Sequence, residues 1–214
     1  MDNSFYINIF MLISLILTAG YFFGRKKNRA IAASSINTLS RILKPESQEI
    51  INIGGLVGYH LKMRFKEGNV QRASGTITLL PRHSLLYLPI SRFFRRFDRF
   101  FITIKMSRLP AGGKVHLFEK RFYHRYRKDE GKGMEVKNLS RERYEFLLFY
   151  QNSRGLSFLQ DLLSRIENPD KLKEVSIHPG KGVIEIMVIP SDGKNRLLRS
   201  ILDRVSEKYS ISGN

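Results

Sequence analysis

The pattern of hydrophobic positions divides the chain into an uninterrupted apolar segment and a longer part in which apolar and polar residues alternate. Residues 5–23 read FYINIFMLISLILTAGYFF and carry no charged side chain. A helix of this length is roughly 30 Å long, which is the thickness of the hydrocarbon core of a bilayer. Residues 1–24 are therefore predicted to be a transmembrane anchor. The side chains expected in lipid are Phe5, Ile9, Leu12, Leu15, Ile16 and Phe22.

Two other structures are compatible with an apolar segment near the N-terminus: a signal peptide and a buried core helix. A cleaved signal peptide has basic residues before a short apolar region, whereas here only Asp2 is charged before the segment and the basic run follows it. A buried core helix seldom has this length without one charge. The length and the flanks favour a membrane anchor.

The residues after the apolar segment predict its orientation. Arg25, Lys26, Lys27 and Arg29 follow at once, and basic residues beside a span stay on the cytoplasmic side. The protein is therefore expected in the cell membrane, with its N-terminus outside and residues 25–214 in the cytoplasm. The same cluster suits anionic headgroups. Gly20 and Gly24 form a small-xxx-small pair, which leaves open packing of the span against another small membrane subunit.

Residues 25–48 are predicted to form a juxtamembrane helix that continues from the span. Ala32, Ile36, Leu39 and Leu43 fall on one helical face, and Pro45 marks the end of the pattern. That apolar face suits either the membrane surface or the following domain, and docking on the domain is favoured.

Residues 49–214 are predicted to form a cytoplasmic α+β domain, with two lobes, 49–142 and 143–214, as an open alternative. Period-two alternation predicts strands over 59–65 and 100–106. Further strands are predicted over 70–80, 144–150, 174–178 and 183–189. Helical periodicity predicts helices over 153–166, capped by Ser153, and over 197–209. The strand over 144–150 is apolar on both faces and is therefore expected to be central. The expected architecture is a mixed or antiparallel sheet with helices packed mainly on one face.

Two stretches combine basic and aromatic residues. Residues 81–97 are predicted to contain an amphipathic helix, either covering the sheet or presenting arginines to phosphates or headgroups. Residues 120–128 read KRFYHRYRK and are expected as a loop within a long hairpin of 114–123 with 134–137. Such a loop is either a solvated basic loop, which is slightly favoured, or a contact for looped or single-stranded RNA.

The net charge of the chain indicates which kind of partner it binds. The chain has 37 Lys and Arg against 19 Asp and Glu, a formal net charge of +18, which favours polyanions such as nucleic acid or an anionic membrane face. The residues predicted to contact headgroups or rRNA are Arg25, Lys26, Lys27, Arg29, Arg92, Arg95, Arg96, Arg99, Arg121, Arg125, Arg127 and Lys128.

Catalytic patterns are missing from the sequence. There is no cysteine, the five histidines lack the spacing of a metal pair, and neither a P-loop nor a nucleophile elbow is present. No catalytic residue, metal ligand or cofactor is therefore expected, and the protein is not expected to be an enzyme. An enzyme whose site is assembled from residues distant in the sequence is a third class of function that the sequence leaves open.

Several dispersed stretches resemble the calumin-like family, whose member is the membrane-anchored subunit of the eukaryotic PAT complex. The resemblance covers most of residues 20–209. It lies in GRKKNRAIAASSINTLSRIL, above all Gly24, Asn28, Asn37, Thr38 and Leu43; in LLPRHSLLYLPISRFFRRFDRFFITIKM; and in residues 144–163 and 174–209. The family's acidic lumenal segment and charged helical tail have no counterpart, so calcium binding is not implied. The expectation is a reduced prokaryotic or archaeal relative.

The resemblance implies a non-enzymatic factor that assists insertion and folding of multi-spanning membrane proteins. Its expected partners are membrane lipid, the Sec translocon and the ribosome through rRNA. The alternative is a membrane-tethered module that binds RNA or anionic lipid and has no part in translocation.

Overall fold

The computed structural model describes residues 3–109, 113–193 and 195–209. The helices are α1 (Asn3–Leu43), α2 (Leu88–Arg95), α3 (Lys120–Tyr126), α4 (Ser153–Arg165) and α5 (Arg196–Tyr209), with short 3-10 turns at Pro169–Lys171 and Pro179–Lys181. The strands are β1 (Ser47–Asn52), β2 (Gly58–Arg64), β3 (Val70–Thr78), β4 (Arg99–Met106), β5 (Val115–Glu119), β6 (Glu135–Arg141), β7 (Tyr144–Tyr150), β8 (Leu172–His178) and β9 (Val183–Val188).

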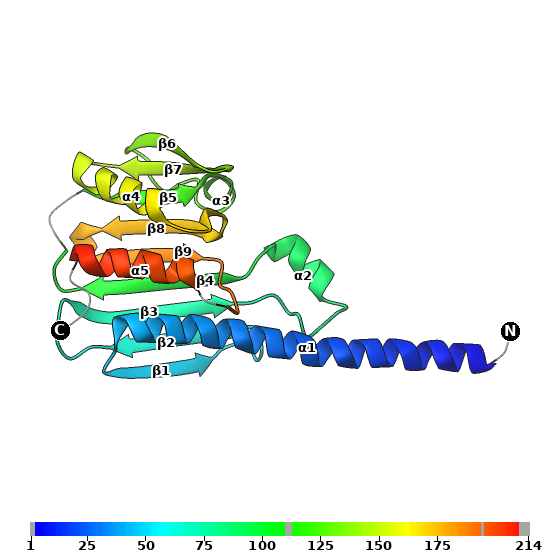
Figure 1. Cartoon of the computed structure of the whole chain (residues 1–214). Coiled ribbons are helices and arrows are strands. Elements are labelled where there is room, and N and C mark those ends of the chain that lie inside the picture. Colours follow the sequence, from blue (N-terminus) through cyan, green and yellow to red (C-terminus); the bar gives the residue numbers. More distant parts are fainter. Residues whose placement is uncertain (1–2, 110–112, 194, 210–214) are drawn as a thin grey trace.

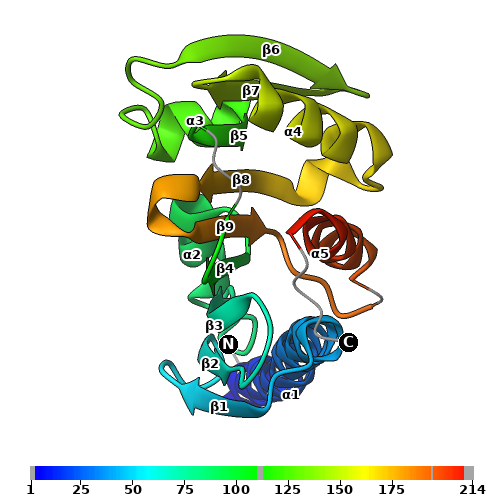
Figure 2. The same ribbon diagram turned by 90° about the vertical axis from the view of Figure 1, so that its left-hand side faces the viewer.

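The strands form one sheet in the order β1-β2-β3-β4-β9-β8-β5-β7-β6. Every pairing between neighbours is antiparallel, so the α+β prediction is confirmed in its antiparallel form. The sheet includes strands from both sides of residue 142. Figure 2 shows it edge on, with α1, α5 and α4 on one face and α3 on the other.

Helix α1 runs without a break from the apolar segment into the domain (Figure 1). Its second half packs on the sheet, where Ile31, Leu39 and Leu43 are buried. Its first half projects beyond the sheet, and Phe10 and Leu15 keep 71% and 68% of their surface exposed. By length and composition, this helix is able to cross a membrane.

The two faces of the sheet are covered unequally. The main core lies under α1, α4 and α5, where Leu159, Leu162, Ile201 and Leu202 are fully buried. The opposite face holds a smaller cluster of Phe118, Phe122, Leu147, Phe149 and Met187, which α3 covers. The prediction of helices mainly on one face is therefore confirmed, with α3 as the exception.

Several local predictions were wrong. Strand β5 pairs with β7 and β8 rather than with β6, so the expected hairpin of 114–123 with 134–137 does not form. Strand β7 is next to the edge strand β6 rather than central, and its apolar faces are covered by α3 and α4. Strand β1 was not predicted. The N-cap of α4 is Asn152 instead of Ser153, and its side chain makes no capping bond.

Residues 120–126 form a helix rather than a loop because the sequence meets two local requirements. The carboxylate of Glu119 accepts hydrogen bonds from the backbone N–H groups of Arg121 and Phe122, which caps the helix. Phe122 and Tyr126 are four residues apart, so a helix places both on one face, and their ring centroids are 5.2 Å apart.

Helix α2 does not cover the sheet, as one reading of residues 81–97 expected. It projects past the ends of the strands, on the side from which the first half of α1 emerges (Figure 1). Its Phe93 and Phe94 keep 75% and 69% of their surface exposed.

One end of the sheet lies beside the point where α1 leaves the domain, and we call it the proximal end. The register places the end of β3 opposite the start of β4, and the end of β5 opposite the start of β7 and β8. Asn28 of α1 donates hydrogen bonds to the carbonyls of Leu56 and Leu80, which lie in the loops at this end. The loops 53–57, 79–98 and 142–143 and the start of α3 therefore share one end of the molecule.

Candidate polyanion-binding site

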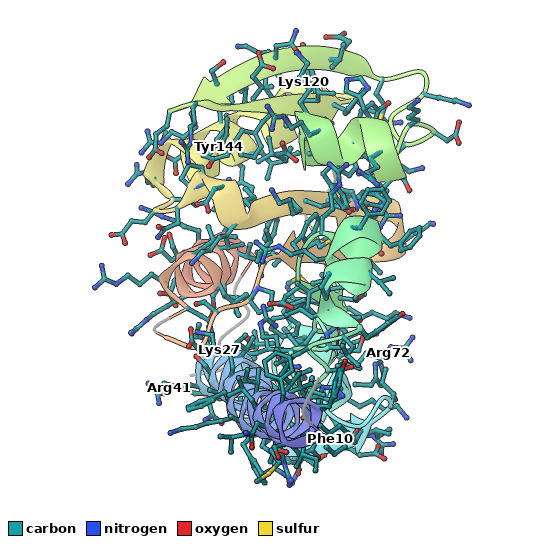
Figure 3. All side chains as sticks on the ribbon, turned by 90° about the vertical axis from the view of Figure 1, so that its right-hand side faces the viewer. Phe10, Lys27, Arg41, Arg72, Lys120 and Tyr144 are labelled. Carbon is teal, nitrogen blue, oxygen red and sulfur yellow. The ribbon has the colours of Figure 1, made fainter. Side chains whose placement is uncertain are left out.

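A cleft of about 590 Å³ opens at the proximal end between α2, α3 and the start of β7. It is lined by Arg96, Phe97, Glu119, Lys120, Arg121, Phe122, Arg125, Tyr126, Arg143, Tyr144, Glu145 and Lys173. Lys120 and Tyr144 mark its place in Figure 3, which views the molecule from the side of the N-terminus. Basic and aromatic side chains dominate this lining.

Helix α3 supplies one wall of the cleft. Because its inner face is held by Phe122 and Tyr126, the arginines one position before each of them, Arg121 and Arg125, point outward and are exposed. The hydroxyl of Tyr126 is buried and, among the described residues, has no hydrogen-bond partner. This wall of the cleft therefore offers two exposed guanidinium groups.

The residues after α2 supply the opposite wall. Arg96 caps α2 with a positive φ of 63° and is exposed. The guanidinium carbon of Arg99 lies 4.8 Å from the ring centroid of Tyr126 and 5.5 Å from that of Phe97. This stacking ties the start of β4 to α3 and fixes the two walls relative to each other.

A two-residue turn between β6 and β7 adds a third basic group. Glu142 adopts a positive φ of 54°, which is typical of tight hairpin turns, and Arg143 follows it. The Nε of Arg143 donates to the hydroxyl of Tyr144 at 3.1 Å, so the guanidinium is held beside an aromatic ring at the cleft.

Lys173 forms the floor of the cleft and is buried. Burial lowers the pKa of Lys173, while the carboxylate of Glu119, 3.7 Å from Nζ, opposes this shift. Nζ also donates to the carbonyl of Asp170 at 2.8 Å. The positive charge of Lys173 is thus balanced within the protein by Glu119 and the carbonyl of Asp170.

The other cations differ in how far they are compensated. Lys120 pairs with Glu145 at 3.0 Å. No ion pair involves Arg96, Arg121, Arg125 or Arg143 among the described residues. Four unpaired guanidinium groups around aromatic rings suit a ligand that carries phosphate groups, because planar donors bind phosphate oxygens at two points.

The sequence-predicted basic residues other than Arg127 and Lys128 divide into three groups. The structure brings Arg96, Arg121 and Arg125 together at the cleft, with Arg99 stacked behind them. Arg92 lies on the exposed side of α2, and the side chain of Arg95 lies outside the described part of the chain. Arg25, Lys26 and Arg29 lie on α1 away from the cleft, while Lys27 pairs with Asp192.

Arg127 and Lys128 do not line the cleft, although both were predicted to contact a polyanion. Nε of Arg127 donates to the buried carboxylate of Glu174 at 3.2 Å, so Arg127 neutralises a core acid. Lys128 is exposed in the turn after α3, and its carbonyl accepts from the hydroxyl of Tyr123.

Sequence reasoning missed Lys120, Arg143 and Lys173. Lys120 lay within the basic stretch but was not singled out. Arg143 and Lys173 lie outside the two basic and aromatic stretches of the sequence, and they reach the cleft because β7 and β8 both border β5. That pairing was not predicted, so no sequence signal placed them.

A separate buried polar cluster lies near the middle of the sheet on the α3 side. His116 Nδ1 lies 2.9 Å from Ser176 Oγ, which donates to Glu174 at 3.1 Å. Burial, followed by the charge of His178, lowers the pKa of His116 to about 4. Glu185 lies 3.4 Å from Nε2 of His178, and this hydrogen bond lowers the pKa of Glu185.

This cluster does not have the geometry of a catalytic triad. In a triad the imidazole lies between the nucleophile and the acid, whereas here the serine lies between His116 and Glu174. Ser176 is also 1% exposed, which leaves a substrate no approach. The cluster instead holds three adjacent strands, β5, β8 and β9, together by polar contacts.

Comparison with known proteins adds no family. No protein-family model matches the chain, and no curated protein is significantly similar to it. Within residues 3–109, 113–193 and 195–209, no group of three or more His, Cys, Asp or Glu side chains is arranged to hold a metal ion. The site is therefore interpreted from its own geometry.

Proposed function

We propose that the chain is a single-pass membrane protein whose basic domain acts, without catalysis, in membrane-protein biogenesis beside the Sec translocon and the ribosome. One observation carries the proposal: an exposed apolar helix continues without a break into the domain core, and the domain's basic cleft opens at the end from which that helix emerges. If residues 5–23 lie in the bilayer, the proximal end faces its surface. The resemblance to the calumin-like family supplies the biological setting.

The orientation follows from the basic residues at the helix exit. Arg25, Lys26 and Arg29 favour the cytoplasmic side, so the domain lies where ribosomes meet the translocon. The cleft at the proximal end offers unpaired arginines to a polyanion at the membrane surface. Ribosomal RNA is such a polyanion, and its binding falls steeply with salt.

Purification of the tagged full chain from mildly solubilised native membranes tests this proposal. We expect ribosomal or translocon components to co-purify at low salt and to be lost as salt increases. A variant with Arg96, Arg121, Arg125 and Arg143 replaced by Gln should recover less of the ribosome at unchanged protein yield. Recovery of neither the ribosome nor the translocon contradicts the proposal. Equal recovery of the ribosome by wild type and variant contradicts the role of the cleft.

A second candidate function is binding of anionic lipid without a part in translocation, which the cleft's place at the proximal end favours. It predicts that the purified full chain, reconstituted in vesicles, clusters phosphatidylglycerol around itself, whereas the same four-Gln variant does not. Ribosome co-purification independent of these arginines, together with lipid clustering that depends on them, would favour this second function for the cleft.

A further inference from the structure

The connection between β3 and β4 carries an exposed apolar patch that the function above does not use. Leu86, Tyr87, Ile90, Phe93 and Phe94 each keep between half and three quarters of their surface exposed. They lie on α2 and on the turn before it. We call residues 83–94 the α2 foot; Figure 3 shows α2 in front of the sheet when the molecule is viewed from the N-terminal side.

Contacts with α1 fix the depth of the α2 foot relative to the apolar helix. A Cβ on Gly20 would lie 2.3 Å from a side-chain carbon of Leu85, so the two segments touch there. The rings of Tyr21 and His83 lie edge to face at 6.0 Å. Gly20 precedes Arg25 by about 7 Å along the helix axis at 1.5 Å per residue. The foot therefore reaches below the basic flank, alongside the last turns of the apolar segment.

A buried polar network holds the foot at this depth. Asp98 is 5% exposed and receives both terminal nitrogens of Arg82, at 3.0 and 2.6 Å, and the backbone N–H of Leu80. Arg82 also donates to Asn28 of α1 at 3.0 Å. A Cβ on Gly24 would lie 2.1 Å from the carbonyl oxygen of Arg82, which shows that the backbones are in close contact. Both ends of the connection are thus fixed to α1.

The composition of the foot suits the boundary between headgroups and acyl chains. Its apolar residues are flanked by Arg92 and Arg96, which are both exposed. Helices that lie in this boundary combine a large apolar face with basic residues and insert about 5–10 Å. The depth fixed by Gly20 and Leu85 falls in that range.

We propose that the α2 foot is a second membrane contact, inserted into the cytoplasmic leaflet of the membrane that α1 crosses. The proposal rests on the proposed anchoring by α1. Lipid is the expected occupant because the foot lies beside residues 17–22, a part of α1 that is itself predicted to be in lipid. A cleft lined by Leu17, Thr18, Tyr21, Phe22 and the turn 83–86 continues this apolar surface from one segment to the other. With two contacts, the domain cannot rotate about the anchor, and the basic cleft is held against the membrane surface.

Fluorescence quenching by brominated lipids measures the depth of the foot in the intact protein. The chain has no cysteine, so a single introduced thiol is labelled cleanly. The test compares the environment-sensitive dye NBD at Phe93→Cys, at Phe10→Cys in the anchor, and at Arg72→Cys. Arg72 is exposed near the far end of β3, where Val70 pairs with Met106. The full chain is reconstituted in vesicles of phosphatidylcholine and phosphatidylglycerol with brominated acyl chains.

We expect the dye at position 93 to emit at shorter wavelength than at 72 and to be quenched less than at 10 but clearly more than at 72. If the dye at position 10 is quenched and the dye at position 93 is not, insertion of the α2 foot is contradicted while anchoring by α1 is supported. The absence of quenching at both positions overturns the anchor and the foot together. A blue-shifted but unquenched dye at 93 shows that protein, such as a second copy of the chain, covers the patch, and this also overturns the proposal.

A second set of variants checks that the apolar side chains cause the insertion. In a chain labelled at Leu86→Cys, replacing Phe93 and Phe94 by Ser should reduce lipid quenching, because these rings are exposed and their loss leaves the core intact. The matched control is Val136→Ser, an exposed apolar residue on edge strand β6. Unchanged quenching in the Phe93 and Phe94 variant, or equal loss in the control, contradicts the proposal.

Discussion

The two halves of α1 are one continuous helix, yet they differ in what their hydrophobic residues contact. In the first half, apolar side chains surround the whole helix, and Phe5, Leu12 and Phe22 are all more than half exposed. In the second half, apolar residues form one stripe, and Leu39 is fully buried on the sheet. A helix that is apolar all round needs an apolar surrounding, whereas an amphipathic helix needs one packed partner. The domain supplies the partner, and we propose that a bilayer supplies the apolar surrounding.

The strongest test of this difference is a matched pair of truncations. Leu39→Ala removes a fully buried side chain and should lower the free energy of unfolding of the domain by about 2–5 kcal/mol. Leu12→Ala should leave domain unfolding within about 0.5 kcal/mol, because the side chain is 57% exposed and lies outside the buried core. Denaturant unfolding of the full chain in mild detergent measures both. Equal effects would show that the first half also packs on protein.

Neutralising the acid at the junction of the halves should have the next largest effect. Asp98→Asn replaces the buried carboxylate by a neutral amide and so removes the ion pair with Arg82, which also donates a hydrogen bond to Asn28 of α1. Because Arg82 is partly solvated, we expect a loss of about 2 kcal/mol, below the 3–5 of a fully buried pair. Asp192→Asn is the control: its pair with Lys27 is exposed and its loss should cost less than about 1 kcal/mol.

Acid should destabilise the domain and leave the anchor unaffected. The pKa of His116 is about 4 in the folded chain, below its unfolded value, so the unfolded state binds more protons between the two. The stability contribution is present above the unfolded pKa of about 6.5 and falls by about 2 kcal/mol at pH 5. Residues 5–23 carry no acidic, basic or histidine side chain, so membrane retention should not change.

The other charged groups of this cluster do not all act in the same direction. Burial raises the pKa of Glu174, against the charge of Arg127, and this partly offsets the loss on acidification. The hydrogen bond from His178 lowers the pKa of Glu185, so the domain loses further stability when the pH falls below the usual pKa of a glutamate. Comparing wild type with His116→Gln by unfolding at pH 7.5 and 5 isolates the histidine. An equal pH slope in both proteins contradicts its assignment.

Two glycines of α1 should differ in how well they tolerate a methyl group, and the smallest expected effect is at Gly20. Gly24→Ala places a methyl group against the backbone of Arg82 and His83, which cannot move aside as a flexible side chain can. The strain of about 3 kcal/mol therefore outweighs the roughly 1 kcal/mol of helix propensity that the change recovers, and a net loss of about 2 kcal/mol is expected. Gly20→Ala meets only the flexible side chain of Leu85 and should be neutral or stabilising. The same unfolding assay compares the two variants, and a reversed order contradicts the contact.

Individual helices and strands were predictable because each gives its hydrophobic residues a characteristic spacing. Examples are the helical spacing of Ile36, Leu39 and Leu43, the alternation in β4 and the apolar stripe of α5. The sheet order was not predictable, since β5 pairs with β7 and β8 across intervening helices. The KRFYHRYRK stretch was misread because its aromatic residues satisfy a helical period that the basic residues obscure.

The candidate site was predictable only in part for the same reason. Arg96, Arg121 and Arg125 lie in basic stretches and were identified from charge alone. Arg127 lies in the same stretch but pairs with Glu174, a partner distant in the chain that only the fold brings near. Arg143 and Lys173 reach the cleft through strand pairing. The exposure of Phe93 and Phe94 likewise depends on where α2 projects, which composition does not specify.

The central claim is that the first half of α1 is an uncleaved membrane anchor. The most direct test is to wash native membranes with alkaline carbonate and to measure the intact mass of the chain that remains. We predict that the chain stays in the membrane pellet with residues 1–24 still attached. Extraction into the supernatant, or a retained mass that lacks these residues, would contradict the account.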